Sequence, residues 1–286
     1  MTKTMNTFFQ KLLSALLLAC CVALGAGTPG CQNVEGDYEE GVTALEADDY
    51  ETALKKFRSA AQGNHPGAQA ALGELYFHGK GIQRNAPEAA KWYQLAAEQG
   101  NTDAQVTLGW MYNVGTGVAQ DVVEAIKWFR LAADQGHPGA QNNLGMMYRE
   151  GRGTEKDEEK AVVWFRMAAE QGIAPAQYAL GQMYLNGEGV KPRVEKAVLW
   201  YTRAATQGLV EAQADLGYLY ATRKNVIPQD TLNAYKWLAL AAQHDGKITK
   251  RDLANVMANM SPDQIKEGDQ LVQEWKQEHP GKQDPR

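Results

Sequence analysis

Cysteine is scarce in this sequence and is confined to its first residues. Of the 286 residues only three are cysteines, Cys20, Cys21 and Cys31. They cannot supply a disulfide framework, so packing and hydrogen bonds must hold the folded part of the chain together. Proline is also scarce, with 10 residues beside 28 glycines, which excludes a collagen-like chain.

An excess of positive charge is absent as well. The chain carries 29 lysines and arginines against 34 aspartates and glutamates, a net charge of −5. Proteins that bind nucleic acid through a basic face have the opposite balance, so we expect no nucleic-acid partner. Hydrophobic residues make up 44% of the chain and charged residues 22%, which excludes wholesale disorder.

The longest apolar run lies near the N-terminus. Residues 12–26 follow two lysines, Lys3 and Lys11, and no acidic residue precedes them. A basic start, an apolar centre and small residues at the exit predict a secretory signal peptide over residues 1–26. The run of about 15 residues is shorter than the roughly 20 that a membrane-spanning helix needs.

A second interpretation of this segment stays open. The string Leu17-Leu18-Ala19-Cys20 resembles the lipoprotein box of bacteria, which would place the signal at residues 1–19 and a lipid on Cys20. Both interpretations export the protein, either to the periplasm or medium or to the outer membrane. We expect contact with a membrane only through such a lipid, and we expect residues 27–34 to be a linker.

The glycines belong to an internal repeat of 36 residues. A leucine followed by glycine recurs in this register, and a tyrosine follows three residues after each glycine. The recurring leucines are Leu72, Leu108, Leu144, Leu180 and Leu216. Agreement at this many positions predicts five units, at 65–100, 101–136, 137–172, 173–208 and 209–245.

Each unit has the pattern of two helices. In the first unit, Ala68, Leu72, Leu75 and Tyr76 follow helical spacing, and a second apolar face begins at Ala89. Paired glycines between the two helices predict a break, and a glycine after the second predicts a left-handed helix end. The glycine after each recurring leucine costs about 1 kcal/mol inside a helix. We expect the recurring tryptophan of the partner helix to lie close to it as compensation.

The second unit shows most clearly the pattern of a known family. It reads Ala104-Gln105-x-x-Leu108-Gly109-x-x-Tyr112-x-x-Gly115-x-Gly117-Val118, then Ala125-x-x-Trp128-Phe129-x-x-Ala132-Ala133-x-Gln135-Gly136. This pattern resembles the Sel-one-like repeat family, a relative of the tetratricopeptide repeat, over residues 65–244. The resemblance implies an all-α, right-handed α-solenoid of antiparallel helix hairpins that acts in protein–protein interaction.

The two ends of the array differ from the units between them. Residues 35–63 look like a shorter tetratricopeptide unit, and residues 246–278 are predicted to form capping helices before a polar tail at 279–286. Solenoids need such atypical ends to cover their core. In the fifth unit Thr222-Arg223-Lys224-Asn225 replaces the paired glycines, and Asp245 replaces the final glycine.

The resemblance also implies where a partner binds. In tetratricopeptide-like arrays the first helix of each hairpin lines the concave face, and its variable positions contact ligands. By register these positions are Glu74, Phe77, His78, Val106, Trp110, Asn113, Asn142, Met146, Arg149, Tyr178, Gln182, Leu185 and Tyr218. Aromatic and amide side chains suit an extended peptide or a protein loop. The alternative is that some of them are simply exposed or fill gaps between units.

No catalytic constellation stands out. The paired glycines lack the preceding strand and the following Gly-Lys-Ser/Thr of a phosphate-binding loop. The five histidines form no pair at i, i+4 and join no cysteine, and no nucleophile lies beside a base. We therefore predict no catalytic residues, no metal site and no cofactor, and we expect a monomer.

Three hypotheses for function follow. The first is a non-enzymatic exported adaptor that binds a peptide or protein partner on its concave face. The second is an immunity or inhibitor protein directed against a secreted effector. The third is a β-lactam-binding or hydrolysing enzyme, as described for cysteine-rich relatives of this family, but the five units lack the cysteine pairs of those relatives.

Overall fold

The computed structural model describes residues 33–222, 230–244 and 247–281. In these ranges the chain forms fourteen α-helices and no strand. The expected signal segment 1–26, its alternative 1–19 with Cys20, most of the 27–34 linker and the end of the 279–286 tail lie outside the described residues. So do Arg223–Asn225 and Asp245 of the fifth unit.

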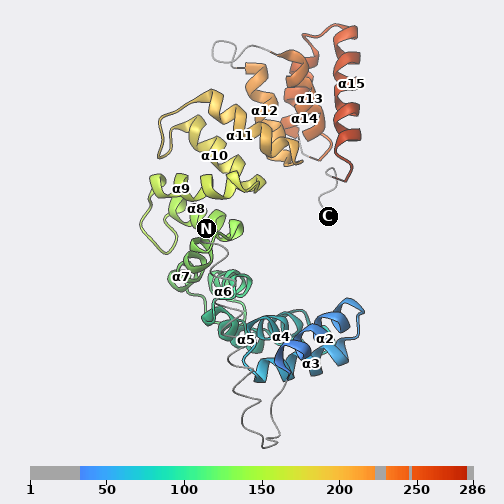
Figure 1. Ribbon diagram of the computed structural model, residues 1–286. Coiled ribbons are helices and arrows are strands. Elements are labelled where there is room, and N and C mark those ends of the chain that lie inside the picture. The colour runs from blue at the N-terminus through green and yellow to red at the C-terminus, as the bar shows by residue number, and fades with distance from the viewer. Residues whose placement is uncertain (1–32, 223–229, 245–246, 282–286) are drawn as a thin grey trace, which may run out of the picture.

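Twelve helices pair into six consecutive hairpins, and two more follow (Figure 1). The hairpins are α2 (Val34–Glu46) with α3 (Tyr50–Gln62), α4 (Pro66–His78) with α5 (Ala86–Glu98), α6 (Thr102–Val114) with α7 (Val122–Asp134), α8 (Pro138–Glu150) with α9 (Glu158–Glu170), α10 (Ala174–Asn186) with α11 (Val194–Thr206), and α12 (Val210–Thr222) with α13 (Thr231–Ala241). The last two helices are α14 (Lys247–Met257) and α15 (Pro262–Glu278). Through α13, each helix packs mainly against its neighbours in sequence, so the prediction of an all-α solenoid is confirmed.

Local chemistry sets the helix ends. Gly79 ends α4 with φ of 74°, and Gly100 follows α5 with φ of 86°, a region that side chains with a Cβ rarely adopt. The equivalent glycines of the next three units do the same. Helix starts are capped by polar side chains: the Nδ1 atom of His65 accepts a hydrogen bond from the Ala68 amide at 3.1 Å. His137 caps α8 in the same way, so these two histidines have a structural role.

In the first four units the glycine inside the first helix lies against an aromatic ring, but not against the expected tryptophan, and in the fifth unit Gly217 lies against Leu238. The ring belongs to the residue after the tryptophan, which is Tyr93 opposite Gly73 and Phe129 opposite Gly109. A Cβ at Gly181 would lie 2.5 Å from the Cδ1 atom of Tyr201. The two helices of a hairpin therefore approach closely enough to exclude even a methyl group.

Buried glutamines, which were not predicted from the sequence, join the units. The Oε1 atom of Gln105 accepts a hydrogen bond from Gln135 at 2.8 Å, and its Nε2 atom donates to the carbonyl of Ala97 at 3.0 Å. Gln105 thus ties α6 to α7 of its own unit and to α5 of the unit before. Gln141 and Gln177 repeat both bonds. We call Gln105, Gln141 and Gln177, with the glutamines that donate to them, the glutamine ladder.

Replacing Gln141 by leucine is expected to lower the free energy of unfolding by about 1–3 kcal/mol, because two hydrogen bonds of about 0.5–1.5 kcal/mol each are lost, one to the Ala133 carbonyl and one from the Gln171 amide. Chemical unfolding followed by circular dichroism measures the change. The matched control is Gln62→Leu at the exposed end of α3, which we expect to alter stability by less than about 0.5 kcal/mol. Equal losses in the two variants would contradict a structural role for the ladder.

Helices outside the five units pack against both ends of the array. At the start, the ring of Tyr38 on α2 stacks on that of His65, which caps α4, with centroids 4.2 Å apart. At the other end, Trp275 of α15 packs edge-on to Trp237 of α13, with ring centroids 6.3 Å apart. Ser261 begins α15 with a reciprocal capping box. The apolar faces of the terminal units are therefore covered.

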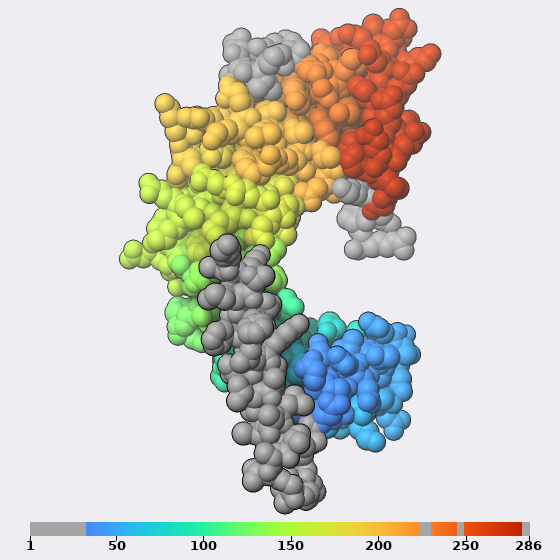
Figure 2. All heavy atoms as spheres, viewed as in Figure 1, coloured from blue at the N-terminus to red at the C-terminus, as the bar shows by residue number. Residues whose placement is uncertain are grey.

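The array curves around a hollow. Figure 2 shows this hollow between the N-terminal hairpins in blue and the C-terminal helices in red. First helices of some adjoining hairpins contact each other directly, as α2 contacts α4 and α8 contacts α10. In Figure 1, α2, α4 and α6 lie on the side of their hairpins that faces the hollow. We call the face formed by the first helices the inner face, or the inside of the curve.

Candidate partner-binding surface

The residues expected to bind a partner lie on the five first helices α4, α6, α8, α10 and α12. Five of them are exposed, namely Glu74, His78, Trp110, Met146 and Tyr218. The other eight are half-buried, namely Phe77, Val106, Asn113, Asn142, Arg149, Tyr178, Gln182 and Leu185. The set therefore divides into free side chains and side chains that the fold already uses.

Three large side chains occupy the same position of their units and remain exposed. Tyr218 is 50% exposed, Trp110 is 42% and Met146 is 39%. Their spacing of 36 residues, or a multiple of it, places them in one row along the first helices. Exposed aromatic and thioether side chains in a row differ from the isolated apolar residues that any surface carries.

Phe77, Trp110 and Met146 form one apolar cluster across three units. The rings of Phe77 on α4 and Trp110 on α6 meet edge to face, with centroids 5.8 Å apart. Trp110 and Met146 line a small cavity of about 60 Å³ between α6 and α8, together with Asn113 and Arg152. We call Phe77, Trp110 and Met146 the apolar cluster. Because it bridges first helices, it lies on the inside of the curve.

Two of the expected residues, Arg149 and Gln182, are bonded to each other across neighbouring units and do not form a free surface. The Nε atom of Arg149 lies 2.7 Å from Oε2 of Glu188, and its Nη1 atom donates to Gln182 at 3.0 Å. The Arg149 guanidinium lowers the pKa of the Glu188 carboxyl. Glu188 lies 39 residues after Arg149 in a loop, so the register of the first helices gave no sign of it.

Tyr178 is also engaged within the fold. Its hydroxyl donates to the Oδ2 atom of Asp215 on α12 at 2.9 Å, and its ring packs against Tyr201. Burial raises the pKa of Tyr178, and the nearby Asp215 carboxylate raises it further. Burial likewise raises the pKa of Asp215, although the Tyr178 hydroxyl opposes that shift. Tyr178 therefore holds the Asp215 carboxylate in place, and its ring is not free to contact a partner.

Four further residues are half-buried and contact the core or neighbouring side chains. Val106 and Leu185 pack against the core, so they fill gaps between units. Asn113 accepts a hydrogen bond from Arg152 at 2.8 Å, and the Nδ2 atom of Asn142 lies 3.8 Å from the Met146 sulfur. These four residues fill gaps or make local hydrogen bonds, so they are not free to contact a partner as the register had predicted.

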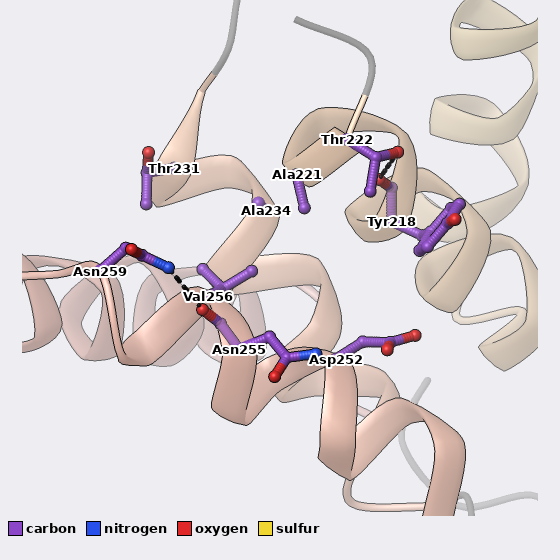
Figure 3. Close-up of a pocket in the computed structure, with 9 residues that line it drawn as sticks. All are labelled: Tyr218, Ala221, Thr222, Thr231, Ala234, Asp252, Asn255, Val256 and Asn259. Carbon is purple, nitrogen blue, oxygen red and sulfur yellow. Dashed lines mark hydrogen bonds between the residues drawn. The ribbon is translucent and has the colours of Figure 1, made fainter.

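A pocket lies beside the C-terminal end of the row. This pocket of about 360 Å³ opens between α12, α13 and α14, and Tyr218, Thr222, Asp252, Asn255 and Asn259 are among its lining residues (Figure 3). The floor is formed by small or branched apolar side chains, Ala221, Ala234 and Val256. In the described part of the chain, no three histidine, cysteine, aspartate or glutamate side chains are placed to hold a metal ion.

The comparison with protein families matches the repeat region unit by unit. The family model of the Sel1 repeat matches residues 66–101, 102–137, 138–173, 174–209 and 210–246. The chain belongs to the Sel1 repeat family. Sel1 repeat proteins are generally protein-interaction scaffolds. The last match is one residue longer than the others, in agreement with Trp237, which follows Trp200 by 37 residues instead of 36.

Solved structures also resemble the chain. A Sel1 repeat protein from Oxalobacter formigenes is 33% identical, with a TM-score of 0.72, over 85% of this chain and 100% of its own. An immunity protein from Pseudomonas aeruginosa is 22% identical, with a TM-score of 0.42, over 76% of this chain and 83% of its own. No curated protein matches the chain. None of the described helices combines the length and apolarity needed to cross a membrane.

Proposed function

We propose that this Sel1 repeat protein is a non-enzymatic, exported adaptor that binds a segment of a partner protein on the inside of its curve. The observation that carries the proposal is the exposed row of Trp110, Met146 and Tyr218, with Phe77 beside it. Aromatic side chains dominate the binding energy of protein interfaces, and methionine adapts to varied partners. Because the row stands on rigid helices, binding orders little of the adaptor itself.

The second helices offer a matched comparison surface. Leu95 and Leu131 are 43% and 48% exposed, at equivalent positions of neighbouring units. Their exposure resembles that of Trp110 and Met146, but they lie on α5 and α7, on the outside of the curve. If the partner binds the inner face, truncating Trp110 and Met146 should weaken binding, whereas truncating the similarly exposed Leu95 and Leu131 should not.

Affinity capture from the native envelope, with quantitative mass spectrometry, tests the proposal. We expect a Trp110→Ala/Met146→Ala variant to recover its partner at least tenfold less than wild type, because two anchors are lost. The control, Leu95→Ala/Leu131→Ala, should recover it as wild type does. Full capture by the inner variant, or its loss in the outer control only, would contradict the proposal.

Export itself is tested on the mature protein. Removal of residues 1–26 leaves Gly27 as the first residue, whereas processing at the lipoprotein box leaves an acylated Cys20. We expect the intact mass of the protein from the soluble envelope fraction to correspond to a start at Gly27. A mass that corresponds to the complete 286 residues would contradict export.

A further inference from the structure

The inside of the curve differs in character along its length. The apolar cluster occupies the N-terminal part, on α4, α6 and α8. Further along, α12 carries Glu211, Asp215 and Tyr218 at positions i, i+4 and i+7, which lie on one face of a helix. A partner segment that follows the inner face from α4 to α12 meets apolar side chains first and carboxylates last.

The two carboxylates of α12 lack a basic partner within the described residues. The ion pairs there involve neither Glu211 nor Asp215. Like charges at i, i+4 destabilise a helix. Burial raises the pKa of Asp215, and so does the neighbouring Glu211, while the hydrogen bond from the Tyr178 hydroxyl opposes the shift. Asp215 is therefore a partly desolvated carboxylate with a neutral hydrogen-bond donor and, among the described residues, no ion-pair partner.

The first helices offer these carboxylates no free cation. Among α4, α6, α8, α10 and α12, Arg149 of α8 is the one lysine or arginine, and Glu188 holds it at 2.7 Å. The carboxylates of α12 therefore leave a negative charge on this row of helices.

Tyr218 adds a ring beside the carboxylates. It is half-exposed, one turn beyond Asp215, and lines the pocket that α14 closes on the other side. In Figure 3, Asp252 of α14 lies across this pocket from Tyr218. A lysine or arginine side chain gains both from carboxylates and from the face of an aromatic ring.

We propose that the inner face binds one extended segment of a partner protein with large apolar side chains at one end and a lysine or arginine at the other. The apolar side chains pack on Phe77, Trp110 and Met146. The basic side chain pairs with Glu211 and Asp215 and lies against Tyr218. This inference rests on the proposed function and specifies the chemistry and the direction of the bound segment.

The geometry sets the length of that segment. Three units separate α6 from α12. Packed helices lie on the order of 10 Å apart, so the two ends of the site are roughly 30 Å apart along the row. An extended chain covers about 3.3 Å per residue, which places the apolar and basic side chains about nine residues apart.

Defined peptides test the inference. The probes are fluorescein-labelled peptides with a Leu-Trp pair, a glycine-serine spacer of about six, nine or twelve residues, and a Lys-Lys or Glu-Glu pair, made in both chain directions. Fluorescence anisotropy with the mature protein at about 50 mM salt measures affinity, because surface charge pairs are strongest at low salt. We expect a lysine peptide to bind at least tenfold more tightly than its glutamate counterpart.

Variants assign the preference to the proposed residues. Glu211→Gln/Asp215→Asn should abolish the preference for lysine, and Glu211→Lys/Asp215→Lys should reverse it. Trp110→Ala should weaken the binding of the lysine and the glutamate peptides to the same extent. The charge-matched control Glu98→Lys/Glu170→Lys, at exposed positions of α5 and α9, should keep the lysine preference. Circular dichroism verifies that each variant is folded.

Two outcomes overturn the inference. One is a wild-type protein that binds no lysine peptide more tightly than its glutamate counterpart. The other is a Glu211→Lys/Asp215→Lys variant that still prefers lysine. If native capture nevertheless depends on Trp110 and Met146, the adaptor function stands and only the chemistry of the segment is wrong. If capture does not depend on them, the proposed function falls as well.

Discussion

Replacing Phe165 by alanine is expected to lower the free energy of unfolding by about 3–5 kcal/mol. Phe165 is fully buried in the central unit, and its ring fills the space over Gly145. Because each unit of a solenoid contacts only its neighbours, the loss also weakens the coupling between the two halves of the array. Urea unfolding followed by circular dichroism should show a lower midpoint and a broader transition.

The same helix supplies the control for this prediction. Val163 lies two residues before Phe165 on α9 but is 51% exposed. Val163→Ala should change the free energy of unfolding by less than about 0.5 kcal/mol. If both variants unfolded at the wild-type midpoint, the assignment of Phe165 to the central core would be wrong.

Gly181→Ala is expected to destabilise the protein by about 1–3 kcal/mol, although alanine is the better helix former. The added methyl group would lie 2.5 Å from the Tyr201 ring, so α10 and α11 must move apart. The sign should reverse when the ring is absent. In a Tyr201→Ala background the same change should stabilise the protein by about 1 kcal/mol, the helix propensity alone.

A double-mutant cycle in urea measures this reversal. Gly139→Ala is the matched control, because an added methyl group there meets only the His137 ring, whose side chain can move. Its effect should stay within about 1 kcal/mol. A Gly181→Ala single variant more stable than wild type would contradict close packing at this crossing, even if the double variant does not fold.

The regular features of this fold could be predicted from the sequence because each repeats in one register. Leu72 with Gly73 and the paired glycines from Gly79 located both helices of a unit and the turn between them. The aromatic partner of the internal glycine was predicted wrongly. Tryptophan recurs in all five units and was therefore the expected partner, whereas the side chain on the glycine belongs to the next position, which varies between tyrosine, phenylalanine and leucine, as at Tyr93, Phe129 and Leu238.

The glutamine ladder was missed for a physical reason. Gln105 and Gln135 were visible in the repeat pattern, but a glutamine normally indicates an exposed position. Only the arrangement of three helices in space shows that their amides satisfy one another. A polar residue that recurs at the same place in every unit, beside apolar neighbours, is the signal that could have found the ladder.

The candidate surface was only partly accessible to sequence reasoning. Register alone placed the thirteen residues on first helices, but it treated them as equivalent. Contacts with loops and with other units separate them, as when Glu188 engages Arg149 or Asp215 engages Tyr178. These partners lie 37 to 39 residues away, so a pattern within one unit cannot reveal them.

The glutamine ladder also bears on how the length of such a protein can change. In each internal unit the ladder glutamine accepts one hydrogen bond from its own unit and donates one to the unit before, so removing or duplicating 36 residues in register would join ends that already match. An insertion of any other length between a ladder glutamine and one of its partners would separate that pair. Gene duplication can therefore lengthen or shorten the array in whole units, which varies the reach of its inner face while every junction stays the same.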